Sequence, residues 1–382
     1  MNDTFQQSAI LFAGGKTGGH LFPGIAVAES LQGVVDRIGF AGSGGRVERT
    51  ETSRRGYDYF VVNAVSAMEL RRRPVRSFLR AAWAYLVARR IVKRFAPSVV
   101  IGLGGYVSVP VVLAARHLGV PVTLLEQNVI PGRATRWLSR HGGAVCVAFD
   151  ETEVALPNAT CCHNTGNPIR DADVPQRSHG RYRELVVLGG SQGARSLNEV
   201  VPAALGHLDP QMAGEWLVRH QCGHHDAGEV MRAYEAAGWR AEVSRFVDWP
   251  QRWIAGADLV VARAGATTLA EIASLGAATI LVPYPHAVDD HQRANAEWYA
   301  SRGAAVIVEE SPRREAWSDR LAEVVAGLIV SEQRRQTLAE AMRGCGRPEA
   351  ASHVARIVAA MSGDTGEIGL EVGRGRSDGT GV

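Results

Sequence analysis

The feature that most constrains the fold of this chain is a rhythm of short apolar runs, each followed by a longer stretch with helical periodicity. Runs this short and apolar are typical of strands in a parallel sheet that helices cover on both faces. The rhythm occurs in both halves of the sequence and predicts two doubly wound α/β domains. The expected strands are Ala9–Phe12, Arg37–Phe40, Phe60–Asn63, Val99–Gly102, Val120–Leu125, Ala144–Ala148, Leu185–Leu188, Trp216–Arg219, Ala241–Phe246, Leu259–Ala262, Thr279–Val282 and Ala305–Val308.

A segment with the composition of a linker joins the two halves. Residues 164–183 hold prolines among polar and charged side chains, as is typical of a connection between independently folded domains. We place the boundary near residue 170, which predicts an N-terminal domain over residues 1–169 and a C-terminal domain over residues 170–362. Residues 363–382 are rich in glycine and have no apolar period, which predicts a disordered tail.

Charge and hydropathy argue against a general nucleic-acid-binding protein, an exported protein and an integral membrane protein. The 42 Lys and Arg residues stand against 39 Asp and Glu residues, and a net charge of +3 is far from the strongly basic balance of nucleic-acid binders. The N-terminus lacks the positive start and apolar core of a signal peptide. Glycines and a proline interrupt the longest uncharged stretch, Ser98–Ala115, and predict a strand, a glycine turn and a helix there.

The cysteines predict neither a disulfide framework nor a zinc site. Five cysteines at uneven spacing fit a reducing cytoplasm. Two groups combine cysteine with histidine, but neither has the spacing of zinc ligands, so we expect surface loops there and no metal site. These groups are Cys161, Cys162 and His163, and His220, Cys222, His224 and His225.

The first strand runs into a glycine-rich turn that suits a phosphate group. The sequence from Gly14 to His20 is GGKTGGH, and Pro23 favours the first turn of a helix. Glycines let backbone N–H groups approach a ligand at a helix N-terminus, where the helix dipole favours anions. Ile10 stands where a Walker A loop needs glycine, and the dinucleotide pattern GxGxxG is absent from this turn. A tight turn that binds no ligand is the alternative.

Two further turns follow strands of the second half. In Gly189–Ala194, the Ser191 hydroxyl and the adjacent amides could bind a diphosphate. Arg263–Glu271 opens a helix in which Glu271 could accept hydrogen bonds from ribose hydroxyls. Because ligands of parallel sheets bind beyond the carboxyl ends of the strands, turns from both halves would face one cleft. Sugar-nucleotide transfer needs such a set, with a uridine pocket, a diphosphate site and a facing domain that delivers an acceptor hydroxyl.

Taken together and in this order, the motifs resemble those of the MurG family, the UDP-N-acetylglucosamine:undecaprenyl-diphospho-muramoyl-pentapeptide N-acetylglucosaminyltransferases of peptidoglycan synthesis. The resemblance extends to about residue 360. The motifs that carry it are GGxTGGHxFPG from Gly14 to Gly24, GGYVS from Gly104, Glu126-Gln127-Asn128, GNPIR from Gly166 to Arg170, GGSQGA from Gly189, RAGA from Arg263 with Glu271, and Asp290-His291-Gln292 with Asn295-Ala296.

The resemblance implies a GT-B fold and an inverting transfer without a bound metal or another cofactor. The donor would be UDP-N-acetylglucosamine (UDP-GlcNAc). The acceptor would be lipid I, the undecaprenyl-linked muramoyl-pentapeptide, whose muramoyl 4-hydroxyl receives the sugar to give lipid II. The N-terminal domain would face the acceptor and the membrane, the C-terminal domain would bind UDP-GlcNAc, and the last helix would pack back on the N-terminal domain. Cell-wall synthesis proteins are expected as partners, and nucleic acid is not.

Carried over residue by residue, the resemblance assigns catalytic roles to His20 and Glu126. His20 would act on the acceptor as a general base or an orienting donor, and a structural histidine at the helix start is the alternative. Val247 would offer a main-chain contact to uracil, Glu271 would bind the ribose, and Gln292 would bind the GlcNAc hydroxyls. The other substrate-binding residues that the resemblance implies are Thr17, Gly18, Gly19, Asn128, Arg170, Ser191, Gln192, Gly193, Ala266, Thr267, Thr268, Leu269 and Ala270.

Two residues depart from the family pattern. Lys16 stands where members commonly carry glycine or have one residue fewer, and it would add a cation near the phosphates. Leu125 replaces a frequent histidine before the Glu-Gln-Asn run, which argues that no essential proton transfer occurs at this position.

One segment concentrates the positive charge of the chain. Residues 71–95 contain nine of the 42 basic residues and no acidic residue. Its apolar residues recur at helical spacing and could pack on the core or enter a bilayer beside the arginines. With a lipid-linked acceptor, the segment predicts peripheral association with an anionic membrane surface, at the cytoplasmic face of the cell membrane; an ordinary amphipathic helix is the alternative. The apolar residues are Phe78, Leu79, Ala82, Trp83 and Leu86.

Three other interpretations compete with this one. Asp171-Ala172-Asp173 has the form of a metal-binding Asp-x-Asp, but it lies in the linker, and such a triplet is expected about once by chance. The same fold could serve a transferase with another lipid acceptor or a UDP-sugar epimerase. A non-catalytic nucleotide-sugar-binding protein would lack some of the side chains expected at a catalytic site, whereas His20, Glu126 and Glu271 are all present.

Overall fold

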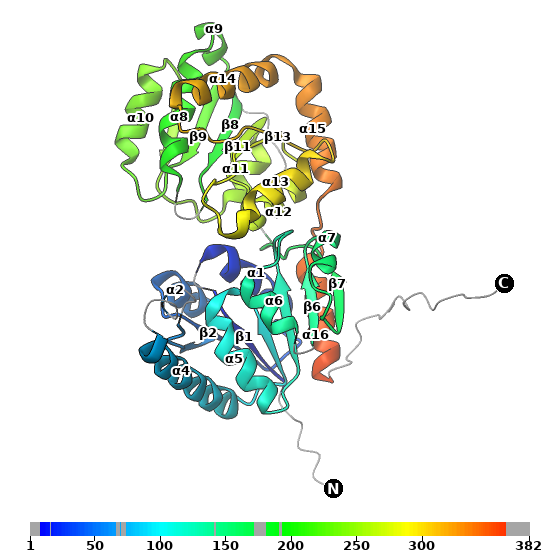
Figure 1. Ribbon diagram of the computed structural model, residues 1–382. Coiled ribbons are helices and arrows are strands. Elements are labelled where there is room, and N and C mark those ends of the chain that lie inside the picture. Colours follow the sequence, from blue (N-terminus) through cyan, green and yellow to red (C-terminus); the bar gives the residue numbers. More distant parts are fainter. Residues whose placement is uncertain are drawn as a thin grey trace, which may run out of the picture.

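The computed structural model describes residues 8–15, 17–65, 69, 74–140, 143–171, 181–190 and 193–363. Strands and helices alternate through both halves, and the strands form two separate sheets, one in each half (Figure 1). Within both sheets the neighbouring strands run parallel. The predicted pair of doubly wound α/β domains is therefore confirmed.

The N-terminal sheet has seven strands in the order β3-β2-β1-β4-β5-β6-β7. Its central strands are short, apolar and buried on both faces, which is why the sequence predicts them well. The elements are β1 Ala9–Ala13, α1 Gly18–Ser30, β2 Arg37–Gly42, α2 Arg46–Arg54, β3 Asp58–Val61, α4 Pro74–Phe95, β4 Val99–Gly102, α5 Gly105–His117, β5 Val122–Glu126, α6 Arg133–Ser139, β6 Ala144–Val147, α7 Asp150–Val154 and β7 Cys161–Asn164.

The C-terminal sheet has six strands in the order β10-β9-β8-β11-β12-β13. The elements are β8 Arg183–Leu188, α8 Arg195–Gly206, α9 Pro210–Ala213, β9 Trp216–Gln221, α10 Ala227–Ala236, β10 Ala241–Ser244, α11 Pro250–Gly256, β11 Leu259–Ala262, α12 Ala266–Leu275, β12 Thr279–Leu281, the 3₁₀ turn η1 Val288–Asp290, α13 His291–Ala300, β13 Val306–Ile307, α14 Arg314–Val330, α15 Glu332–Gly344 and α16 Ala350–Ser362.

Both sheets reverse their strand order at the first strand, and this reversal positions the functional turns. β1 lies between β2 and β4, and β8 lies between β9 and β11. Connections leave such a point toward opposite faces of the sheet and open a crevice at the carboxyl ends of the two strands. The turns after β1 and β4 therefore lie side by side in one half, and the turns after β8 and β11 do so in the other.

Two edge strands differ from the prediction. The sequence predicts a surface loop at Cys161–His163, because Cys-Cys-His-Asn has no apolar run. In the structure these residues belong to β7, the exposed edge strand of the sheet. β3 covers Asp58–Val61 rather than Phe60–Asn63, since its pairing with β2 begins where Asp58 lies opposite Gly39. An edge strand gains its backbone hydrogen bonds from a single neighbour and needs little burial.

The prediction of a surface loop around His220 is wrong. His220 lies in β9 and is fully buried, with its Nδ1 2.7 Å from the Tyr234 hydroxyl and its Nε2 2.9 Å from Asn198 Oδ1. Burial lowers the pKa of this imidazole to about 3, so the neutral ring is a hydrogen-bonded part of the core. Within the described ranges, no group of three or more His, Cys, Asp or Glu side chains could hold a metal ion.

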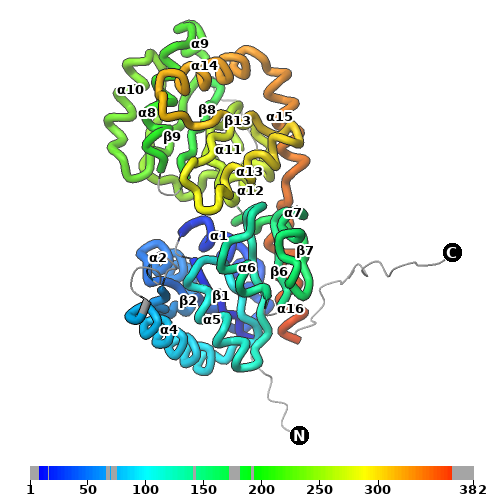
Figure 2. The backbone as a smooth tube through the Cα atoms, in the orientation of Figure 1, coloured from blue at the N-terminus to red at the C-terminus, as the bar shows by residue number. Residues whose placement is uncertain are grey.

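The last helix crosses back to the N-terminal sheet. Figures 1 and 2 show α15 beside the upper half and α16 beside β6 in the lower half. Val354 and Val358 of α16 are fully buried in one apolar cluster with Ile10 and Ile25. The predicted boundary near residue 170 remains a prediction, and residues 172–180 of the linker and 364–382 of the tail lie outside the described residues.

Candidate functional site

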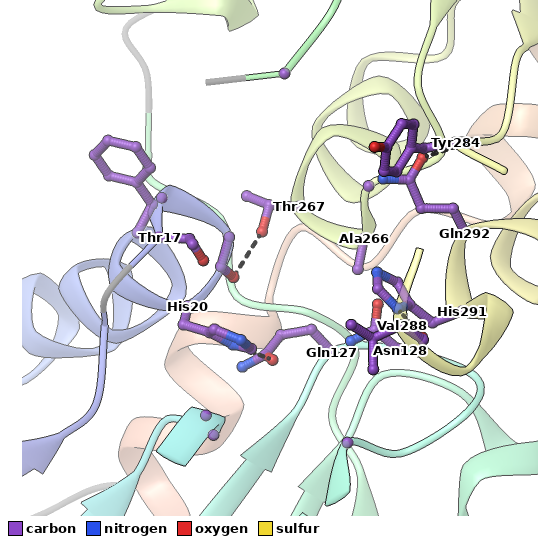
Figure 3. Close-up of a pocket in the computed structure, with 18 of the residues that line it drawn as sticks. Thr17, His20, Gln127, Asn128, Ala266, Thr267, Tyr284, Val288, His291 and Gln292 are labelled. Atoms are coloured by element: carbon purple, nitrogen blue, oxygen red, sulfur yellow. Dashed lines mark hydrogen bonds between the residues drawn. The ribbon is translucent and has the colours of Figure 1, made fainter. Parts of the chain in front are cut away.

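A cleft of about 1720 Å³ lies between the two halves and collects the predicted site residues. In Figure 3, Thr17 and His20 of the N-terminal half face Ala266 and Thr267 of the C-terminal half. Ser191 and Gln192, like Lys16, lie outside the described residues. The predicted residues that line the cleft are Thr17, Gly18, Gly19, His20, Glu126, Asn128, Arg170, Gly193, Val247, Ala266, Thr267, Thr268, Glu271 and Gln292.

Two predicted residues are not brought to the cleft. The side chain of Leu269 is fully buried in the apolar core beneath α12, and its backbone N–H donates to Gly265 O. Ala270 is half-buried on the same helix and is not among the described residues that line the cleft. Along a helix of 3.6 residues per turn, a run of five consecutive positions cannot present every side chain to one ligand.

Glycine is required where the turns approach one another. Gly14 has a φ of +125°, and a Cβ atom there would lie 2.7 Å from Gly104 O. Gly193 has a φ of +74°, and a Cβ atom there would collide with the backbone of Cys222. By contrast, a Cβ atom on Gly265, directly before α12, would meet no atom within 4 Å. The turns are closed toward the core, and the N-terminus of α12 faces open space, as an anion site requires.

His20 is held over the second glycine turn of the N-terminal half. Its Nδ1 lies 3.2 Å from Gln127 Oε1, and Gln127 Nε2 donates to Leu103 O at 3.5 Å. A Cβ atom on Gly104 would lie 3.4 Å from the ring, so the glycine makes room for the imidazole. The half-buried ring lines the cleft, and its Gln127 contact fixes the ring orientation.

Glu126, for which the resemblance implies a catalytic role, forms hydrogen bonds with its own loop. The carboxylate is buried at the end of β5, where Oε1 accepts from Asn128 N at 3.1 Å and from Asn128 Nδ2 at 3.2 Å. Its Oε2 accepts from Gly132 N at 2.9 Å. Both oxygens therefore hold the loop that follows β5, and the geometry favours positioning over proton transfer.

Glu271 is a buried carboxyl at the edge of the cleft. It is 5% exposed, and Gln251 Nε2 donates to its Oε1 at 2.6 Å. Burial raises the pKa of Glu271 to about 7, against the smaller opposing effects of the Arg170 charge and the Gln251 hydrogen bond. A carboxyl buried away from water can accept further hydrogen bonds from a ligand that enters the cleft.

Arg170 is a buried cation at the cleft. Its guanidinium lies between the rings of Phe22 and Trp249, 4.2 Å and 4.6 Å from their centroids, and its Nη2 donates to Asp248 O at 3.0 Å. Burial lowers the pKa of Arg170. The aromatic rings come from opposite halves, so Arg170 is fixed where the two halves meet.

The raised pKa of Glu271 predicts a pH-dependent stability. The folded chain binds this proton more tightly than the unfolded chain, so the stabilisation is complete below about pH 4.5 and is lost as the pH rises through 7. The side chain of Glu271→Gln stays neutral at every pH. Relative to the wild type, the free energy of unfolding of this variant should therefore be about 1–3 kcal/mol higher at pH 8 than at pH 5. Urea unfolding of both proteins at the two pH values measures this difference. Parallel pH profiles would contradict it.

Polar contacts across the cleft align the two halves. The Thr267 hydroxyl donates to Gly19 O at 3.1 Å, and Figure 3 shows this bond spanning from α12 to α1. Within the C-terminal half, Gln292 at the start of α13 accepts from Tyr284 N at 3.0 Å through its Oε1. Arg133 of α6 pairs with Asp289, with 2.6 Å between Nη2 and Oδ1.

Three contacts of the site were not predicted. Gln251, the partner of Glu271, is an ordinary glutamine in the sequence. Gln127, the partner of His20, and Asn295 were noted only as parts of motifs. Asn295 is fully buried and donates to Asn128 Oδ1 at 3.1 Å, although 167 positions separate the two residues. No local pattern signals contacts at such separations.

Comparison with known proteins assigns the family. The sequence matches the glycosyltransferase family 28 N-terminal domain over residues 10–147 and the family 28 C-terminal domain over residues 184–356. A UDP-N-acetylglucosamine--N-acetylmuramyl-(pentapeptide) pyrophosphoryl-undecaprenol N-acetylglucosamine transferase of Trichlorobacter lovleyi is 36% identical over 369 residues, covering 90% of this chain and 95% of that protein. A transferase of the same name from Myxococcus xanthus is 38% identical over 358 residues, covering 91% of both chains.

Solved structures agree with this assignment. The crystal structure of Acinetobacter baumannii MurG has a TM-score of 0.72 at 30% identity and covers 92% of this chain and 99% of its own. A putative UDP-N-acetylglucosamine 2-epimerase from Listeria monocytogenes, with a TM-score of 0.65, 10% identity and coverage of 94% of this chain and 97% of its own, shares the fold alone. The matches over both halves, at this identity and coverage, show that the chain belongs to the MurG family, glycosyltransferases of family 28 with the GT-B fold.

Proposed function

We propose that this chain transfers N-acetylglucosamine from UDP-GlcNAc to the muramoyl 4-hydroxyl of lipid I, with inversion at the anomeric carbon, to form lipid II. The observation that carries this proposal is the cleft in which His20 of one half faces the turn before α12 in the other half. Transfer to a hydroxyl needs a base on the acceptor side and groups that stabilise the leaving diphosphate on the donor side.

The C-terminal half has the chemistry of a donor site. Glu271 accepts from the ribose hydroxyls, the Val247 main chain contacts uracil, and Gln292 reaches the GlcNAc hydroxyls. The diphosphate lies at the N-termini of α8 and α12. Gly193 and Gly265 line the cleft there, and a Cβ atom on Gly265 would meet no atom within 4 Å. As UDP leaves, charge develops on the diphosphate, and fixed N–H groups stabilise it more than they stabilise the bound donor.

The N-terminal half supplies the acceptor side. His20 Nε2 takes the proton of the muramoyl 4-hydroxyl while that oxygen attacks the anomeric carbon and the bond to UDP breaks. Glu126 holds the loop that carries Asn128, and so supports the site without taking the proton.

Transfer of label tests the proposal. The chain is incubated with UDP-GlcNAc labelled in the sugar, with and without lipid I, and the lipid and aqueous fractions are analysed separately. Label in the lipid fraction only when lipid I is present is the expected result. Label that stays in free UDP-sugars and moves to an epimer would favour the epimerase, and transfer only to another lipid would favour the second alternative.

We further propose that α4 docks the enzyme on the cytoplasmic face of the membrane. Ala84, Ala88 and Val92 are buried on one side of α4, whereas Phe78 and Trp83 are 70% and 58% exposed on the other. Figures 1 and 2 show α4 on the outside of the N-terminal half. Exposed apolar side chains this close together are unusual for a freely dissolved protein and suit a bilayer interface.

The cleft supports the same orientation. One arm of it continues between α4 and α5, where it is lined by Ala81, Tyr85, Val109 and Leu113. A lipid-linked sugar could therefore reach His20 while its chain remains at the membrane below α4. Among the described residues, no helix is long and apolar enough to cross a membrane, so this proposal concerns docking at the surface.

Charge reversal on α4 tests the docking surface. Arg76 and Arg80 are exposed beside Phe78; Arg72 and Arg73, predicted to act with them, lie outside the described residues. At about 1 kcal/mol per basic residue, Arg76→Glu with Arg80→Glu should weaken sedimentation with anionic vesicles about tenfold or more. The same charge change at the exposed Arg232 and Arg320 of the C-terminal half is the matched control. Equal binding of wild type and the α4 variant, or equal binding to neutral vesicles, would contradict the electrostatic contribution.

A further inference from the structure

Asn295 is a buried amide that joins the two halves of the chain. It lies on α13, one helical turn after Gln292, and is fully buried. Its Oδ1 accepts from Val129 N at 3.0 Å, and its Nδ2 donates to Asn128 Oδ1 at 3.1 Å and to Ala264 O at 3.2 Å. Both hydrogens of the amide are therefore used, one toward each half of the chain.

In the chain of hydrogen bonds from Glu126 through Asn128 to Asn295, the identity of each donor and acceptor is fixed. Glu126 accepts from Asn128 Nδ2, so the Asn128 amide must turn its Oδ1 toward Asn295. Asn295 must in turn present its Nδ2 to Asn128 and to Ala264 O. A carboxylate at position 295 would face two acceptors, and rotation of the Asn128 amide cannot relieve this, because it would place an oxygen against Glu126.

We propose that Asn295 is a positioning residue for the transfer, one that sets the donor-side groups in register with the acceptor-side groups; this rests on the proposed function. Asn295 is not among the described residues that line the cleft, so it acts through its neighbours. Its hydrogen bonds hold the Asn128 loop and the turn that precedes α12. Because Gln292 lies on the same helix, they also fix how far Gln292 reaches into the cleft. Because donor and acceptor groups belong to different halves, a displacement of about 1 Å between them costs on the order of a hundredfold in rate.

A second contact keeps α13 docked when Asn295 is changed. Trp298 Nε1 donates to Glu151 Oε2 at 2.7 Å, and the Trp298 ring packs on Phe149 with 4.9 Å between centroids. Arg302 also pairs with Glu151, at 3.0 Å. Variants of Asn295 are therefore expected to fold with both halves in contact, and to lose the alignment that the amide imposes.

The test is Asn295→Asp, which keeps the shape of the side chain and removes its donor. The turnover number with saturating UDP-GlcNAc and lipid I should fall at least about tenfold. The Kd for UDP should stay within about threefold, because the groups proposed to bind uridine, Val247 and Glu271, lie in the C-terminal half. Tyr234→Phe is the matched control, because it removes a buried hydrogen bond to His220 inside the C-terminal half, and neither residue is among the described residues that line the cleft. It should unfold more easily and keep its turnover number.

A double-mutant cycle separates alignment from general damage. If Asn128 and Asn295 act as one unit, Asn128→Ala with Asn295→Ala should be no slower than the slower single variant. The proposal would be overturned if the turnover losses of the two single variants multiplied in the double variant. It would also be overturned by a turnover number of Asn295→Asp within twofold of the wild type, or by a UDP affinity that fell in proportion to the turnover number. A wild-type chain without transfer activity would overturn the proposed function as well, whereas an active wild type with an equally active Asn295→Asp would overturn the positioning role alone.

Discussion

Replacing His20 by alanine is expected to lower the turnover number about a hundredfold or more, with UDP binding nearly unchanged. The reason is the tautomer that the site imposes. Gln127 donates through Nε2 to Leu103 O and so presents Oε1 to the ring, which requires the proton of the neutral imidazole on Nδ1. Nε2 is then the basic nitrogen, and it can take the proton of the acceptor hydroxyl as a general base.

Gln127→Ala provides the graded comparison for His20→Ala. It keeps the imidazole but removes its orienting partner, so we expect a smaller loss, about tenfold. Initial rates with both substrates saturating, together with calorimetry of UDP binding, measure the two effects. Unchanged turnover in His20→Ala would eliminate the base role. An equal loss of UDP affinity would show instead that the turn after β1 had been disturbed.

The second large effect is expected at Glu271, where alanine should weaken the binding of UDP and of UDP-GlcNAc alike by about 1–3 kcal/mol. The carboxyl is buried and accepts one hydrogen bond from Gln251, so ribose hydroxyls would supply the partners that water supplies to an exposed acid. Because the ionised form is the better acceptor, UDP affinity of the wild type should also rise as the pH passes 7.

Calorimetry across this pH range tests the role of Glu271. Glu235→Ala, an exposed acid on α10 of the same half, is the control for the loss of one negative charge. Wild-type UDP affinity in Glu271→Ala would remove this residue from the site. A loss for UDP-GlcNAc without a loss for UDP would move it from the ribose to the sugar.

Much of the fold could be predicted because its central strands obey a single rule. β1, β4 and β11 are short, apolar and buried on both faces, as is the Leu185–Leu188 part of β8, and a glycine turn follows each of them in the sequence. β7 has neither signal, because an exposed edge strand is held by backbone pairing that no side chain reports. For His220 the sequence predicts a surface loop because the side chain is polar. In the structure Tyr234 and Asn198 form hydrogen bonds with its ring inside the core, so the polar side chain can be buried.

The candidate site divides in the same way. Residues on the turns could be placed at one cleft because parallel strands end at one edge of a sheet. The contacts that decide their roles could not, since Gln251 reaches Glu271 and Asn295 reaches Asn128 only through the tertiary fold. Glu126 is an example: the resemblance implies a catalytic role for it, and no sequence pattern could have predicted the three hydrogen bonds by which it holds the loop after β5.

The structure of the lipid-linked product tests inverting transfer to lipid I most directly. The wild-type chain is incubated with lipid I and UDP-GlcNAc carrying ¹³C in the sugar, and the anomeric configuration and the linkage of the product are read by NMR. Attack of the muramoyl 4-hydroxyl in line with departing UDP gives a β-linked GlcNAc on that oxygen. An α-linked product, attachment at another oxygen, or ¹³C found only in free UDP-sugars would contradict the proposed reaction.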